Sequence, residues 1–337
     1  MKAILCESRS TVRVANLPDP EAGIGEVVIQ VGACNLCGSD LHMAEIKDFE
    51  LPYPFVPGHE LAGTVAVVGE GVRHVQPGDP VAVQPVIRCG TCPLCRRGHA
   101  NLCQNPQVVG LHRPGGFAEY VTVPAENVYT SDGVPHSTAS CTEPLACALY
   151  GLRRLNSRVG SDVLIYGAGG MGLFFLQLIR NSGSGRVTVV DLHPLRLQAA
   201  EDLGADQVVV ADGGEEAVLA EIQPLGFDSV VDATGVPDVV EAAFRHTGPA
   251  GRLLMLGSCP TKGMISIRPR IVQSRDITVV GSFGFGFEFP AALHLLREGR
   301  VTVDPIVTHR YGLDRFVEAW EQARSGTEAI KVQIVPD

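Results

Sequence analysis

Residues 162–172 read DVLIYGAGGMG, and this stretch decides the fold of the second half of the chain. Its apolar run is typical of a buried strand, and the glycines that follow fit the pattern G-x-G-x-x-G. The pattern is weak alone, but between a strand and a helix it predicts a dinucleotide-binding turn. The first glycine permits the tight turn, the second lets a pyrophosphate approach, and the third lets the helix pack on the strand.

A carboxylate follows at the expected distance. Asp191 ends the next predicted strand, residues 186–191. About 20 residues beyond such glycines, a carboxylate accepts both hydroxyls of the adenosine ribose. It would repel a 2′-phosphate, so the sequence favours NAD over NADP. Arg196 either lies along the adenine or belongs to a solvated helix face. The predicted cofactor-binding residues are Gly167, Gly169, Gly170, Met171, Gly172, Asp191 and Arg196.

Strands and helices alternate from about residue 145 onward, which is typical of a doubly wound parallel sheet. We predict strands at 162–167, 186–191, 227–234 and 251–257, with helices from 171, at 193–204 and at 236–246. The first 140 or so residues are instead rich in Val, Gly and Pro, with short β-branched runs between turn-forming clusters. They predict an irregular β module with little helix. A helix at 289–299 and a strand at 329–335 follow.

The composition excludes several classes of protein. The chain has 337 residues, 45% hydrophobic and 19% charged, with a net charge of −10. This charge argues against a nucleic-acid or anionic-membrane surface. No apolar run approaches the roughly 18 residues that span a bilayer, and the N-terminal MKAILCES lacks a signal-peptide core. We therefore expect a cytoplasmic protein whose ten cysteines are metal ligands or core residues rather than disulfides.

Four cysteines lie within the polar segment CGTCPLCRRGHANLC, at residues 89–103. Their spacing is C-x2-C-x2-C-x7-C, which can close a tetrahedron around one Zn²⁺. A shell of four thiolates leaves no position for a substrate, so such a zinc is structural and orders a loop without an apolar core. An iron–sulfur cluster is the alternative, because its ligand spacings are similar. The predicted structural ligands are Cys89, Cys92, Cys95 and Cys103.

Three other segments carry metal-binding side chains: ACNLCGSDLH (33–42), PGHE (57–60) and CTEPLAC (141–147). Each is ambiguous alone. The pair Cys34 and Cys37 fits half a zinc site, a redox pair or neither. An isolated His59 is more often a satisfied histidine than a ligand, and an isolated Glu60 is more often a surface carboxylate.

Together and in this order, GSDLH after a cysteine, PGHE, a four-cysteine lobe, EPLA and GAGGMG resemble the zinc-dependent medium-chain dehydrogenases. The resemblance covers essentially the whole chain, and GHE with EPLA looks most like the polyol branch, typified by sorbitol dehydrogenase. It implies an α/β protein in two domains. The catalytic domain is a GroES-like irregular β domain at 1–150 and 288–337, with its zinc lobe at about 86–107, and the NAD-binding domain is a Rossmann domain at 151–287.

The resemblance also implies a second, catalytic zinc. Cys37 and His59 are its implied ligands, and Glu60 is a direct or exchanging ligand. Glu143 is implied to bind the zinc directly or through its water. Cys141 and Cys147 flank Glu143 as competing thiolates, but the EPLA context favours Glu143. Asp40 is implied to support the ligand loop, and Cys34 is expected to be a small buried residue outside the metal site.

The implied reaction is the reversible oxidation of a secondary alcohol, with hydride passing from a zinc-bound alkoxide to the nicotinamide. Ser39 can face the reacting oxygen, and His42, with an unperturbed pKa near ~6.5, can pass the proton to solvent. The implied catalytic residues are Ser39, His42 and Glu60. The family further suggests a homodimer or homotetramer, for which residues 277–283 are a candidate edge strand.

The sequence departs from the polyol pattern at one position. Sorbitol dehydrogenases commonly carry an Arg that holds substrate hydroxyls, where this chain has Gly284 in SFGFGF. The substrate is therefore open among smaller polyols, cyclic polyols and sugar derivatives. A threonine-type amino-alcohol dehydrogenase and a general secondary alcohol dehydrogenase are the alternatives. Four aromatic residues are either pocket or core residues: Phe49, Phe55, Phe117 and Phe285.

Overall fold

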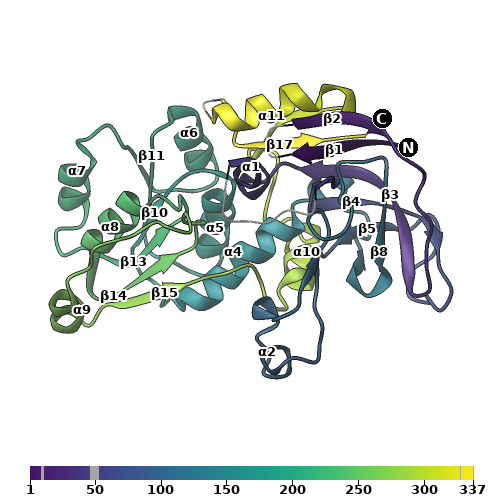
Figure 1. The fold of residues 1–337 in the computed structure, drawn as a ribbon. Helices are drawn as coiled ribbons and strands as arrows, with labels where there is room; N and C mark the ends of the chain where they lie inside the picture. The colour runs from purple at the N-terminus through teal and green to yellow at the C-terminus, as the bar shows by residue number, and fades with distance from the viewer. Residues whose placement is uncertain (9–10, 46–52, 327, 337) are drawn as a thin grey trace. The chain divides into compact units, whose positions relative to one another are not determined.

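The computed structural model describes residues 1–8, 11–45, 53–326 and 328–336, with only the backbone of 42–45. The chain divides into two compact units (Figure 1). Unit 1 consists of Met1–Glu143 and Gly286–Asp337, and unit 2 consists of Pro144–Phe285. All ten cysteines are free thiols.

Unit 2 is built on a six-stranded parallel sheet in the order β12-β11-β10-β13-β14-β15. In chain order this is 3-2-1-4-5-6, the order of a doubly wound dinucleotide-binding sheet, so the predicted fold class is confirmed. Its central strands are buried along their whole length, which explains their near-continuous apolar sequences. The strands are β10 (Val163–Tyr166), β11 (Val187–Asp191), β12 (Gln207–Val210), β13 (Phe227–Asp232), β14 (Thr247–Met255) and β15 (Thr278–Gly281).

The first helix of unit 2 precedes β10, and the others connect these strands. Three have a proline as their first residue, at Pro194, Pro237 and Pro269, where the missing N–H costs nothing. The sequence analysis missed α4, α7, α9 and β12 and placed the others within a few residues. The helices are α4 (Thr142–Leu155), α5 (Gly170–Asn181), α6 (Pro194–Asp202), α7 (Glu215–Ile222), α8 (Pro237–His246) and α9 (Pro269–Arg275).

Unit 1 contains a largely antiparallel sheet in the order β16-β17-β3-β4-β5-β9, with β8 also paired to β3. A separate hairpin joins β1 and β2. The core beneath these strands consists mainly of Val, Ile, Leu and Phe side chains. The strands of unit 1 are β1 (Lys2–Ser8), β2 (Thr11–Asn16), β3 (Glu26–Asn35), β4 (Glu60–Val68), β5 (Pro80–Val83), β6 (Val86–Ile87), β7 (Gln107–Val108), β8 (Tyr120–Pro124), β9 (Val128–Thr130), β16 (Val307–Tyr311) and β17 (Lys331–Ile334).

The segment after unit 2 returns to unit 1 and completes its sheet. Its last strand, β17, pairs antiparallel with β3, where Gln333 lies opposite Asn35. Helix α10 is tied to β9 because Arg297 donates to the Thr130 carbonyl at 3.2 Å and pairs with Asp132 at 2.8 Å. The helices of unit 1 are α1 (Gly38–Glu45), α2 (Pro93–Arg96), α3 (His136–Ala139), α10 (Phe289–Arg297) and α11 (Phe316–Ser325).

Candidate active site

A short hairpin forms the base of the four-cysteine lobe. Strands β6 and β7 pair at its base, with Val86 opposite Val108, and α2 lies inside the loop. The four sulfur atoms lie within 4.8 Å of one another, and the Sγ atoms of Cys89 and Cys103 are 3.5 Å apart. A zinc with Zn–S bonds of about 2.3 Å places tetrahedral sulfurs about 3.8 Å apart. The donor set therefore fits one zinc ion.

Backbone amides favour the thiolate form of two of these sulfurs, Cys89 and Cys92, whereas burial raises the pKa of Cys95 to about 12. The N–H groups of Cys89, Cys92 and Cys95 each approach the sulfur of another cysteine of the lobe at 3.4 Å. Backbone donation from Cys92 and Thr91 lowers the pKa of Cys89 to about 6. Because a thiolate is the form that binds metal, the loop is chemically suited to a cation before the ion arrives.

A second group of donors lies elsewhere in unit 1. Ligand atoms of Cys37, His59 and Glu60 lie within 4.8 Å of one another. Strand pairing explains the meeting, because β3 and β4 pair with Asn35 opposite Glu60. Cys37 follows the end of β3, and His59 precedes the start of β4. A thiol, an imidazole and a carboxylate at this separation fit a zinc site that has an open position.

Asp40 connects two of these donors. One carboxylate oxygen accepts from the Cys37 backbone N–H at 2.9 Å, and the other lies 3.3 Å from Nδ1 of His59. Asp40 is 2% exposed, so this contact is shielded from water. A carboxylate behind a metal-binding imidazole is the usual supporting partner of such a ligand. The position next to the ligand loop, implied for Asp40 by the resemblance, agrees with this geometry.

The electrostatics of the group favour a cation. Burial by itself lowers the pKa of His59, but the Asp40 carboxylate and Cys37 outweigh that effect and raise the pKa well above its ordinary value. A site that favours the charged imidazole has a negative potential. The same potential attracts Zn²⁺, which would replace the proton as the positive charge.

The two predicted proton carriers differ in what the structure describes. The exposed Ser39 places its Oγ 3.4 Å from Nε2 of His59, at the edge of the donor group. The side chain of His42 lies outside the described residues, as does Phe49. A role for Ser39 and His42 in proton transfer therefore stays a prediction.

Lys331 is a buried residue of the site that the sequence analysis missed. It is 8% exposed, and its Nζ lies 2.7 and 2.9 Å from the two carboxylate oxygens of Glu60. Lys331 belongs to β17, so Glu60 is joined to a residue 271 positions away. A signal was present in the sequence AIKVQIV, where a lysine interrupts an otherwise apolar final strand.

The CTEPLAC segment contributes differently from the other two. Cys141 is fully buried beside the Asn35 side chain, and burial raises its pKa to about 12. It is therefore a protonated thiol and a weak competitor for metal. Glu143 lies in the first turn of α4 and is not in the group of three donors that lie within 4.8 Å of one another. Its predicted role as a ligand stays a prediction.

Cys34 belongs to the core and not to a metal site. It is fully buried in the apolar cluster of unit 1, which confirms the prediction for it. Phe55 and Phe117 are buried as well, and Phe117 packs against Phe316 with ring centroids 5.0 Å apart. Phe285, at the end of unit 2, is 3% exposed. These three aromatic residues are therefore core residues.

The glycine turn of unit 2 has the geometry that the sequence predicts. Gly167 has a φ of +97°, a conformation that L side chains rarely adopt. A Cβ on Gly172 would lie 1.8 Å from the Gly167 carbonyl oxygen, so only glycine fits there. A Cβ on Gly169 would meet nothing within 4 Å, which leaves room beside the N-terminus of α5. Gly170 and Met171 form the first turn of that helix, where backbone N–H groups can bind a phosphate.

Asp191 lies at the carboxyl end of β11, next to that turn. Its carboxylate accepts from the Ala168 N–H at 2.7 Å and from the His193 N–H at 2.9 Å. Arg196 approaches the same carboxylate at 4.0 Å. The structure therefore brings Asp191 and Arg196 to the glycine turn, as their predicted roles require. Gly284 has a φ of +54°, so this position also favours glycine over an arginine.

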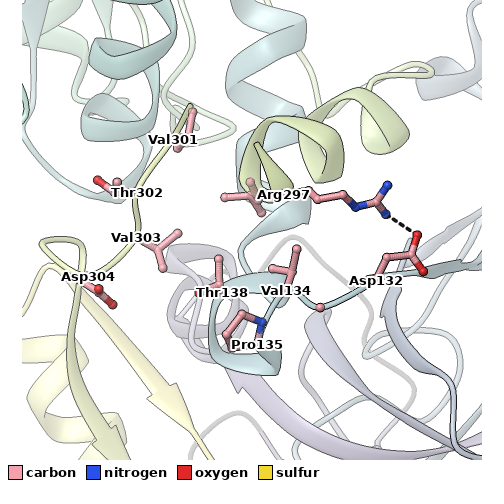
Figure 2. Close-up of a pocket in the computed structure, with 11 residues that line it drawn as sticks. Asp132, Val134, Pro135, Thr138, Arg297, Val301, Thr302, Val303 and Asp304 are labelled. Atoms are coloured by element: carbon pink, nitrogen blue, oxygen red, sulfur yellow. Dashed lines mark ion pairs between the residues drawn. The ribbon is translucent and has the colours of Figure 1, made fainter. Parts of the chain in front are cut away.

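A surface pocket of about 350 Å³ lies between α3 and α10 in unit 1 (Figure 2). Val134, Val301 and Val303 contribute apolar walls, and Arg297 reaches Asp132 at the rim. None of the predicted site residues lines this pocket. We therefore assign it no catalytic role.

Two family models match the chain. One, described as alcohol dehydrogenase GroES-like domain, matches residues 23–133, and one described as zinc-binding dehydrogenase matches residues 170–298. Together with the fold and the two cysteine-containing sites, they show that the chain belongs to the zinc-dependent medium-chain dehydrogenase superfamily. Within the described residues, no helix is both long enough and apolar enough to cross a bilayer.

Individual relatives match over most or all of their lengths. D-altritol 5-dehydrogenase of Agrobacterium fabrum is 32% identical, over 100% of both chains. L-threonine 3-dehydrogenase of Pyrococcus abyssi is 36% identical, over 91% of this chain and 90% of the relative. Among solved structures, a putative zinc-binding dehydrogenase from Sinorhizobium meliloti 1021 bound to NADP has a TM-score of 0.92 and 31% identity, and 99% of each chain is covered.

Proposed function

We propose that this chain is a zinc- and NAD-dependent dehydrogenase that oxidises a secondary alcohol of a polyol, a cyclic polyol or a sugar derivative, and reduces the ketone in the reverse direction. The observation that carries the proposal is the group formed by Cys37, His59 and Glu60, with Asp40 behind His59. A zinc ion with a purely structural role needs no open coordination position. The three donors of this group leave one coordination position of a four-coordinate zinc open.

Different residues of unit 1 bind the metal and transfer the proton. Zinc, when bound, would act as a Lewis acid that lowers the pKa of the substrate hydroxyl. Cys37 and His59 hold the metal, and the Asp40 carboxylate fixes the His59 ring. Ser39 receives the hydroxyl proton, because its Oγ is exposed beside His59. His42 then passes the proton to solvent, and Glu60 or Glu143 supplies the remaining carboxylate.

The residues of unit 2 bind the hydride acceptor. The first turn of α5, with the space beside Gly169, would hold the pyrophosphate of NAD. Asp191 accepts the ribose hydroxyls. NAD is favoured over NADP because Asp191 would repel a 2′-phosphate. Arg196, 4.0 Å from that carboxylate, lies within reach of the adenosine.

The relatives support a hydroxylated substrate and leave its identity open. The altritol relative acts on a polyol, which agrees with the leading proposal. The threonine relative, 36% identical over 91% of this chain, supports a second candidate, an amino-alcohol dehydrogenase of the threonine type. Gly284 stands where sorbitol dehydrogenases carry an arginine, so we expect sorbitol itself to be a poor substrate.

A substrate screen tests this proposal. The purified chain is incubated with NAD and with polyols, sugars, amino alcohols and simple secondary alcohols, and the appearance of NADH is followed by absorbance. We expect a polyol or sugar derivative to give the highest kcat/KM, and a Cys37→Ala chain to give none. A preference for L-threonine would support the second candidate. A chain that holds both zinc ions but forms no NADH with any of the tested alcohols would contradict both candidate functions.

We further propose a cytoplasmic homodimer or homotetramer whose catalytic domain is 1–150 with 288–337 and whose NAD domain is 151–287. Strand β15 is an edge strand of its sheet, and Val279 and Phe283 nearby are 37% and 70% exposed. An apolar edge of this kind suits pairing with a second copy. A monomer by light scattering at micromolar concentration would contradict the assembly.

A further inference from the structure

The geometry points to Gln333 as a positioning residue that fixes the start of α4, and with it Glu143, relative to Cys37. The inference rests on the proposed function, because it assumes a catalytic zinc that takes Glu143 as a ligand. Glu143 lies in the first turn of α4 and outside the group of three clustered donors. A ligand supplied by a separate segment needs other residues to hold that segment in place.

The side-chain amide of Gln333 joins three segments of unit 1. Its nitrogen donates to the side-chain oxygen of Asn35 at 2.8 Å. The same nitrogen lies 2.9 Å from the Ser137 carbonyl oxygen and 3.0 Å from the Ser140 hydroxyl. Gln333 belongs to β17 and Asn35 to the end of β3, whereas the two serines lie in α3 and directly after it, just before α4. One amide thus connects both strands to the chain that leads into α4.

The partners of Gln333 are also joined to each other. The Ser140 hydroxyl donates to the Asn35 side-chain oxygen at 3.3 Å, and the Asn35 side-chain nitrogen donates to the Cys141 sulfur at 3.5 Å. Each of these four residues, Gln333 included, is 0% exposed. Buried polar groups are costly unless each has a partner, so the network favours a single arrangement of the three segments.

This network lies beside two proposed metal ligands along the chain. Asn35 lies two residues before Cys37, and Ser140 lies three residues before Glu143. Apolar side chains at the network positions would also pack. Hydrogen bonds, however, depend on direction as well as distance, so they determine more narrowly where the start of α4 lies.

Loss of the Gln333 amide would leave Asn35 and Ser140 with only the contacts that do not involve β17. The start of α4 would then be free to shift relative to β3. Bonds between a metal and its ligands tolerate a displacement of only about 0.2 Å. A small shift of Glu143 would therefore weaken its bond to the zinc.

The test compares wild type with Gln333→Met, Glu143→Gln and the double variant that carries both changes. Each chain is loaded with zinc, and the release of the catalytic ion to a chelator is timed against the zinc of the four-cysteine lobe. The absorption spectrum with cobalt at the catalytic site reports the ligands independently of activity. Asn127→Leu is the matched control, because Asn127 is another buried amide of unit 1 and donates to the Gln84 and Val86 carbonyls.

We expect Gln333→Met to bind the catalytic zinc about 10- to 100-fold more weakly, to release it faster and to change the cobalt spectrum. Glu143→Gln should release zinc faster as well. The double variant should be no faster than Glu143→Gln, because Gln333 acts through Glu143. Asn127→Leu should lower the melting temperature but keep the zinc release and the cobalt spectrum of the wild type.

Two results would overturn the inference. One is a folded Gln333→Met chain whose zinc release and cobalt spectrum match the wild type. The other is a double variant that releases zinc faster than Glu143→Gln, because Gln333 would then act independently of Glu143. If Gln333→Met does not fold, Ser140→Ala removes one partner from the network and should also speed zinc release, and an unchanged rate would overturn the inference.

The proposed function has a separate outcome. A Glu143→Gln chain that releases zinc at the wild-type rate would overturn the inference about Gln333. Wild-type NAD reduction with a polyol would leave the proposed function standing in that case, with Glu60 as the remaining carboxylate. A wild-type chain that binds only the lobe zinc would overturn both.

Discussion

Oδ1 of Asp40 lies 3.3 Å from Nδ1 of His59, which engages one nitrogen of the imidazole and leaves Nε2 as the metal-binding atom. The same carboxylate accepts from the Cys37 backbone at 2.9 Å. One buried residue thus orients two predicted zinc ligands that lie on different segments of the chain. The predictions below follow from this arrangement and from the other sites.

Removing either donor should remove one metal ion. We expect Cys37→Ala and His59→Ala to bind one zinc per chain instead of two, and to lose activity by about a thousandfold or more, since the Lewis acid supplies several kcal/mol. Elemental analysis and NAD reduction measure both effects. Cys34→Ala is the matched control and should keep both ions, because Cys34 lies in the core. Zinc loss from that control would show that the division between the two cysteines is wrong.

Ser39→Ala should separate metal binding from turnover. Its Oγ is near His59 but is not one of the three clustered donors, so zinc content should stay at two per chain. Loss of a proton-transfer group typically slows a reaction by about 10²–10⁴-fold. Single-turnover kinetics with NAD check the rate of the chemical step. An unchanged rate would remove Ser39 from the mechanism.

Replacing two glycines of the same turn by alanine should affect two different properties, thermal stability and NAD affinity. Gly172→Ala forces a Cβ to 1.8 Å from the Gly167 carbonyl oxygen, so we expect a clear loss of thermal stability. Gly169→Ala meets nothing within 4 Å, so the melting temperature should hold while NAD affinity falls. Thermal melts and NAD titration of both variants test this. Unimpaired NAD binding by Gly169→Ala would place the pyrophosphate elsewhere.

Asp191→Ala should weaken NAD binding and relax the choice of cofactor. Hydrogen bonds to a charged group contribute about 1.5–3 kcal/mol, so the KM for NAD should rise about 10- to 150-fold. The ratio of kcat/KM for NAD to kcat/KM for NADP should also fall. Asp191→Asn is the informative control, because it keeps the size of the side chain and removes its charge. A wild-type chain that prefers NADP would contradict this reading of Asp191.

His246 should make unit 2 less stable in acid. Burial lowers its pKa below the ordinary value, although Glu216 acts in the opposite direction. Below a pH of about 6.5 the unfolded chain therefore binds a proton that the folded chain does not. Stability is lost as the pH falls from there toward the folded pKa. Melting temperatures of wild type and His246→Gln at pH 8 and pH 5.5 should converge in acid, and a constant difference would refute the prediction.

Much of the fold could be predicted because parallel strands buried on both faces leave continuous apolar runs. Val163–Tyr166 and Val187–Asp191 are such strands, and each precedes a helix with a recognisable start. Strand β12 has four residues, and α4 begins among cysteines with Pro144 in its first turn. Neither pattern differs enough from a loop to be recognised. The physical reason is that tertiary packing, rather than local preference, stabilises both.

The site residues also differ in how far the sequence could predict them. The four lobe cysteines lie within one short segment, so their spacing alone predicted the group. Cys37 and Glu60 meet only because β3 pairs with β4, which resemblance to a family could suggest and spacing could not. Lys331 escaped prediction because its partner is 271 residues away, and a single lysine in a strand usually lies at a solvent-facing position.

The position of Lys331 on β17 also sets an order of events during synthesis. The lobe cysteines leave the ribosome roughly 230 residues before Lys331, which at 5–20 residues per second is about 10–50 seconds earlier. The lobe can therefore take up its metal while the chain is still growing. Glu60, in contrast, waits beside Cys37 and His59 without its ammonium partner until β17 joins β3. The two groups of donors are therefore completed at different times, the first from one short segment and the second only after the end of the chain has been made.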